Sequence, residues 1–93
     1  MSDMFGYAFT FNQPIGEWNV SSVTDMYAMF RSAQALNQPI GDWDVSSVIT
    51  MQLMFFGATD FNQDLSSWDV NNVTNYDEFS YNTPNWTLPK PNF

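Results

Sequence analysis

Apolar side chains recur along this chain with a period of 25 residues. Residues 11–35, 36–60 and 61–85 align without gaps, and each contains a Trp followed two and five positions later by Val. The aligned columns are Trp18, Trp43 and Trp68; Val20, Val45 and Val70; Val23, Val48 and Val73. Self-similarity at a fixed period of this length is typical of repeat architectures.

The register continues into both ends of the chain. Residues 1–10 match the second half of a unit, whereas residues 86–93 form a degenerate one. Pro89 and Pro91 cannot donate ladder hydrogen bonds, so we expect residues 86–93 to act as a C-terminal cap. We therefore predict one domain over residues 1–93, made of a partial repeat 1–10, repeats 11–35, 36–60 and 61–85, and the cap. The N-terminal coil has no comparable cap and is expected to be open.

The second half of each unit has the spacing of a helix. Its apolar residues stand at i, i+3, i+4 and i+7, as in Met26, Met29, Phe30 and Ala33. Ser22 and Asp25 just before them fit a capping box at a helix start. The sequence therefore predicts a short helix at this point of the unit.

The first half has the spacing of a strand, because Trp18 and Val20 alternate with polar neighbours. One strand and one helix in each coil fall within the length range of leucine-rich repeats. The predicted fold class is an α/β repeat solenoid, leucine-rich-repeat-like, with one short parallel strand and one short helix per 25-residue coil.

Composition excludes several functions. Ten acidic side chains stand against Arg31 and Lys90 alone, a net charge of −8. Such a chain cannot displace counterions from nucleic acid, and anionic membrane surfaces repel it. No apolar run approaches the roughly 20 residues of a membrane span, and the first residues lack the pattern of a secretory signal. With no Cys, no His and no phosphate-binding loop, we predict no enzyme activity, metal or cofactor.

The unit Phe-Asn-Gln-x-[Ile/Leu]-x-x-Trp-[Asp/Asn]-Val-[Ser/Asn]-[Ser/Asn]-Val-Thr-x-Met-x-x-Met-Phe-x-x-Ala resembles the BspA-type leucine-rich repeats, also described as the bacterial surface-protein 25/26-residue repeat or DUF285. The resemblance covers essentially the whole chain. The resemblance implies a right-handed leucine-rich-repeat-like solenoid of bacterial surface proteins, a cell-surface or extracellular location, and a role in adhesion. The third unit departs from the motif, with Tyr76, Phe79 and Ser80 in place of Met, Met and Phe.

The candidate binding residues are polar positions of the predicted strand: Glu17, Asn19, Asp42, Asp44 and Asp69. Adjacent parallel strands would place Asp44 and Asp69 about 5 Å apart. Like charges at that distance raise each other's pKa or recruit a cation such as calcium. No calcium-loop spacing accompanies them, so a solvated acidic face is favoured and no metal site is predicted.

Two other columns favour structural roles. The pairs Asn12-Gln13, Asn37-Gln38 and Asn62-Gln63 are expected to join coils through their amides. The Trp column could stack as a sugar platform if it were exposed, but its alternation with Val places it in the core.

The leading function is a non-enzymatic binding or adhesion module that recognises a protein or glycan through its polar strand face. The alternative is a structural element whose open N-terminal coil stacks end-on with another copy.

Overall fold

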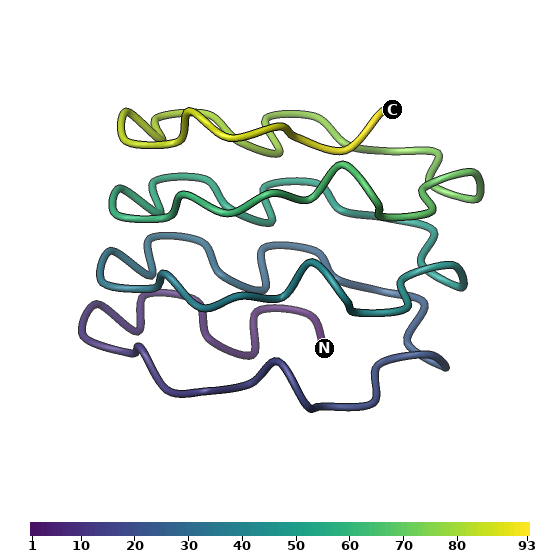
Figure 1. Cartoon of the computed structure of the whole chain (residues 1–93), viewed down its shortest axis with the longest axis horizontal. Helices are drawn as coiled ribbons and strands as arrows, with labels where there is room; N and C mark the ends of the chain where they lie inside the picture. The colour runs from purple at the N-terminus through teal and green to yellow at the C-terminus, as the bar shows by residue number, and fades with distance from the viewer.

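The computed structural model describes residues 1–93, which wind into coils lying one above another (Figure 1). The overall extents are 29 × 22 × 20 Å. Turns and irregular segments make up nearly the whole chain. No helix long and apolar enough to cross a membrane is present.

The predicted α/β solenoid is wrong, because the chain forms no helix and no extended strand. Pairing of strand type is limited to isolated parallel bridges from Thr50 to Asp25 and to Asn75. The molecule is a compact body built mostly of turns, without the alternating helix and strand of a leucine-rich repeat.

The predicted helix is absent because its amides bond to the next coil. In a helix each N–H donates to the carbonyl four residues earlier. Here the amide of Ala28 donates to the Gln52 carbonyl at 2.8 Å, and that of Phe30 donates to Met54 at 2.8 Å. The next coil repeats this pattern, since the amide of Leu53 donates to the Asp77 carbonyl at 3.0 Å.

Two successive turns replace the helix in each unit. The amide of Met29 donates to the Met26 carbonyl, and that of Ala33 donates to Phe30. The third residue of each turn has a positive φ, 52° at Ala28 and 58° at Ser32, as in a type II turn. The equivalent residues of the next coil, Leu53 and Gly57, also have positive φ.

The predicted strand is likewise replaced by turns. The amide of Trp18 donates to the Ile15 carbonyl at 3.1 Å, and that of Val23 donates to Val20 at 3.0 Å. Ile15 and Val20 are buried, so the inward-facing pattern is kept while the backbone is not extended.

The core is a set of stacked apolar columns and contains no buried polar residue. Phe30 and Phe55 stack with ring centroids 5.4 Å apart. Trp43 and Trp68 are each 4% exposed, and their indole N–H groups donate to the carbonyls of Ile15 and Ile40 at 3.0 Å. The predicted core position is therefore confirmed for these two tryptophans. It is wrong for Trp18, which is 37% exposed.

The Asn-Gln pairs join the coils, as predicted. The Asn37 side-chain oxygen accepts from the backbone amide of Asn62 and from Nε2 of Gln63, both at 2.9 Å. Asn12 makes the same two contacts with Asn37 and Gln38. The donors are backbone and Gln amides, so the Asn side chains do not pair with one another.

Candidate functional site

All five predicted binding residues are exposed: Glu17, Asn19, Asp42, Asp44 and Asp69. The structure brings Glu17 and Asp42 together, on successive coils, at the rim of one shallow hollow of about 280 Å³. The rest of its lining is Pro14, Gly16, Gln38 and Pro39. The hollow is thus a polar, acidic depression between two equivalent loops.

The other three residues are engaged in their own turns. Asp44 accepts from the amide and the hydroxyl of Ser46 at 3.0 and 2.5 Å. Asn19 accepts the same two bonds from Ser21, and Asp69 accepts from the amide of Asn71. Side-chain oxygens that accept from the amide two residues ahead form Asx turns, which fix the local backbone.

The pKa of Asp44 is lowered, and not raised as a neighbouring carboxylate would raise it. The hydroxyl and amide of Ser46 both donate to its carboxylate and lower its pKa, and this outweighs a slight desolvation that raises it. Hydrogen bonds to the charged form of a carboxyl stabilise that form. Asp44 is therefore held as an anion.

Asp64 belongs with this group and was missed from the sequence. Its carboxylate accepts from the hydroxyl and the amide of Ser66, which lower its pKa in the same way. The signal that could have found it is the spacing Asp-x-Ser, shared with Asp44 and Ser46. No three acidic side chains come close enough together to hold a metal ion.

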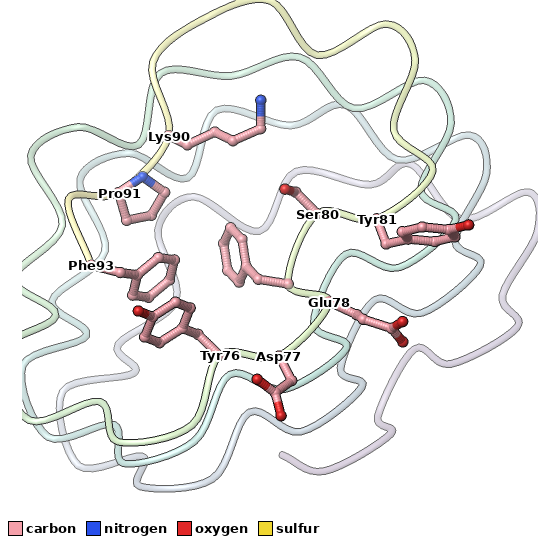
Figure 2. A pocket seen from close by; sticks show the side chains of 9 residues that line it. Tyr76, Asp77, Glu78, Ser80, Tyr81, Lys90, Pro91 and Phe93 are labelled. Carbon is pink, nitrogen blue, oxygen red and sulfur yellow. The ribbon is translucent and has the colours of Figure 1, made fainter.

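A larger hollow of about 480 Å³ lies at the C-terminal end of the stack (Figure 2). Its apolar lining is Tyr76, Phe79, Tyr81, Pro91 and Phe93. Asp77, Glu78, Ser80 and Lys90 supply its polar rim. The rings of Tyr76 and Phe93 stack in parallel with centroids 4.3 Å apart and form one wall.

Sequence reasoning missed this hollow as a site. The available signal was Ser80, which stands in the column occupied by Phe5, Phe30 and Phe55 in the other units. Ser80 and the buried ring of Phe79 both line the hollow.

Both cationic side chains lie over aromatic rings. The Arg31 guanidinium carbon is 5.3 Å from the Tyr7 ring centre and 5.5 Å from that of Phe56. Lys90 Nζ is 5.0 Å from the Trp86 ring centre. Such contacts are attractive at this distance, so Arg31 joins its own coil to the two neighbouring coils and Lys90 packs at the C-terminal end.

The chain matches the family model described as "Mycoplasma protein of unknown function, DUF285" over residues 1–90. The match covers nearly the whole chain, and the protein therefore belongs to the DUF285 family. No curated protein and no solved structure matches it.

Proposed function

We propose that this DUF285 protein is a non-enzymatic binding module that recognises a protein or glycan partner. The proposed contact surface, here called the acidic face, consists of Glu17, Asn19, Asp42, Asp44 and Asp69. Its centre is the hollow that Glu17 and Asp42 share.

The observation that carries this proposal is the pairing of two exposed carboxylates on adjacent coils around one depression. Asp44 and Asp69 are exposed, and each side chain is held in place by a hydrogen bond within its own turn. Carboxylates on a rigid backbone can bind a cationic group without the entropic cost of ordering a loop.

Charge defines the class of partner. With ten acidic and two basic side chains, the protein attracts positively charged surfaces and repels anionic ones. We therefore propose a basic protein surface or a cationic glycan as the ligand. The likeness to BspA-type surface proteins supports a location outside the cell, where adhesion would bring such partners together.

The test is binding of the purified chain to immobilised extracellular-matrix proteins and to glycans with and without amino groups. We expect saturable binding to basic members of the panel, weakened by salt because exposed charges are screened. The double variant Glu17→Gln/Asp42→Asn should lose most of that binding.

The matched control is Asp60→Asn/Asp77→Asn, which removes the same charge from exposed positions outside the acidic face. If both double variants weaken binding equally, net charge alone attracts the ligand and the proposed face is wrong. Absence of saturable binding across the whole panel would also contradict the proposal.

A further inference from the structure

We propose that copies of this chain associate end to end, with residues 1–8 of one copy lying on residues 76–83 of the next. This goes beyond the acidic face, because it uses the two ends of the stack. In this arrangement the 25-residue register of the coils continues from one molecule into the next. Residues 1, 26, 51 and 76 are equivalent, so residue 1 of the neighbouring copy takes the next equivalent position, number 101.

The backbone groups at the two ends are complementary. Within the chain, amides of each unit donate to carbonyls 24 positions later, as Ala28 does to Gln52 and Leu53 to Asp77. In the last coil the equivalent amides, those of Glu78, Ser80 and Asn82, have no acceptor in the chain. Exposed backbone donors of this kind are a template for another chain.

The first coil offers the matching acceptors. The carbonyls of Ser2, Met4 and Gly6 accept no hydrogen bond within the chain. Continuing the register places them opposite the free amides, which gives three bonds: Glu78 to Ser2, Ser80 to Met4, and Asn82 to Gly6. In these three bonds every donor lies at the C-terminal end and every acceptor at the N-terminal end, so they can form only head to tail.

The exposed apolar side chains lie at the same two ends. Large ones at the N-terminal end are Met4, Tyr7, Phe9 and Trp18, and those at the C-terminal end are Tyr76, Tyr81, Leu88 and Phe93. Between the ends only Ile49 is exposed in this way. Contiguous exposed apolar surface marks an interaction site. The register places Met4 over Phe79 and Trp18 over Phe93, which continues the columns of the core.

Trp18 supplies an independent check on the register. The indoles of Trp43 and Trp68 donate to carbonyls 28 positions earlier. Trp18 has no carbonyl at that distance in its own chain. In the end-to-end arrangement the Lys90 carbonyl of the neighbouring copy takes that position, and it accepts no hydrogen bond within its own chain.

One contact opposes association. Asp3 of one copy would lie over Glu78 of the next, and each copy carries a net charge of −8. Like charges repel, and salt screens this repulsion. Association should therefore strengthen as the salt concentration rises. A head-to-tail contact does not close on itself, so the expected products are open chains of variable length.

Single cysteines test the register, because the chain has none of its own. Ser2→Cys and Asp77→Cys, two separate variants, are mixed under mild oxidation at about 1 M NaCl, where the Debye length is about 3 Å. We expect the mixed disulfide to accumulate faster than either homodimer. The mixture of Ser2→Cys with Asp44→Cys, an exposed residue away from both ends, is the control. The double variant Ser2→Cys/Tyr27→Cys is the positive control, because its two cysteines lie one coil apart within one chain. Formation of its disulfide shows that cysteines at this coil spacing can be bridged.

Light scattering supplies the second measurement. The average mass should rise with protein and salt concentration, and Trp18→Phe should reduce the association constant about two- to tenfold, the worth of one hydrogen bond. Glu78→Lys should increase the association constant, because it places a cation opposite Asp3 of the neighbouring copy. The double variant Glu78→Lys/Asp3→Lys should lose this increase, because like charges face each other again. A constant monomer mass, or equal crosslinking of Asp77→Cys and Asp44→Cys with Ser2→Cys, would overturn the proposal.

Discussion

At the scale of single residues, place in the stack determines what a tryptophan does. Trp43 is buried and its indole donates to the Ile15 carbonyl, whereas Trp18 stands in a closely similar stretch of sequence but has no coil beneath it. The sequence identified the column correctly, but only the neighbouring coil decides which members of it are covered.

The first prediction follows from this difference. Trp43→Ala removes a buried ring and an indole hydrogen bond and should lower the free energy of unfolding by about 3–5 kcal/mol. Trp18→Ala is the matched control and should cost clearly less, because 37% of that side chain is already exposed. Urea unfolding monitored by fluorescence measures both variants. Equal losses would mean that Trp18 is as well packed as Trp43.

The second prediction concerns pH. Hydrogen bonds from Ser46 and Ser66 lower the pKa of Asp44 and of Asp64 in the folded protein. The stability they contribute is therefore fully present above the unfolded-state pKa of about 3.9, and it is lost as the pH falls through the lower folded values.

An NMR titration of the side-chain carboxyls tests this directly. Ser46→Ala should raise the pKa of Asp44 toward its ordinary value and leave that of Asp64 unchanged. A pKa of Asp44 that does not respond to the substitution would show that the Asx turn is not the cause.

At the scale of elements, the turn pairs explain why a helix was expected. Residues at i, i+3, i+4 and i+7 face one side of a helix. Two successive turns with a positive φ at Ala28 and Ser32 bury the same positions, Met26, Met29, Phe30 and Ala33. The apolar pattern alone cannot distinguish these structures, because the deciding hydrogen bonds reach residues in another unit.

The third prediction concerns the Asn side chains at equivalent positions of the repeat, Asn12 and Asn37, which join each coil to the next. Asn37→Ala removes the acceptor for the Asn62 amide and for Gln63, and it should cost about 1 kcal/mol. Asn37→Asp keeps an oxygen at the same place and should cost almost nothing in high salt, where the added charge is screened. Thermal unfolding of the two variants compares them. Equal losses would show that the ladder does not depend on this oxygen.

The fourth prediction concerns the close approach of two coils at Gly41 and Asp64. A Cβ at this position would lie 2.7 Å from the Asp64 carbonyl oxygen, so Gly41→Ala must push two coils apart and should cost about 1–3 kcal/mol. Gly6→Ala is the control, because the equivalent positions hold Arg31 and Phe56. Similar melting temperatures for the two variants would contradict the close approach.

At the scale of the whole molecule, the 25-residue register and most of the buried columns could be predicted, because periodic apolar residues must face a common core. The candidate site could be predicted only in part. Glu17 and Asp42 do share a hollow, but Asp44 and Asp69 are engaged in local turns. The end hollow escaped prediction because segments distant in sequence, around Tyr76 and Phe93, meet to form it.

The central claim is that hydrogen bonds between successive coils, and not helices or strands within each unit, hold this chain together. NMR scalar couplings across hydrogen bonds measure it most directly, because they identify donor and acceptor for each bond. Couplings are predicted from the amide nitrogen of Ala28 to the carbonyl carbon of Gln52, and from Leu53 to Asp77. A coupling from the amide of Phe30 to the carbonyl of Met26, the bond of an α-helix, would contradict the account.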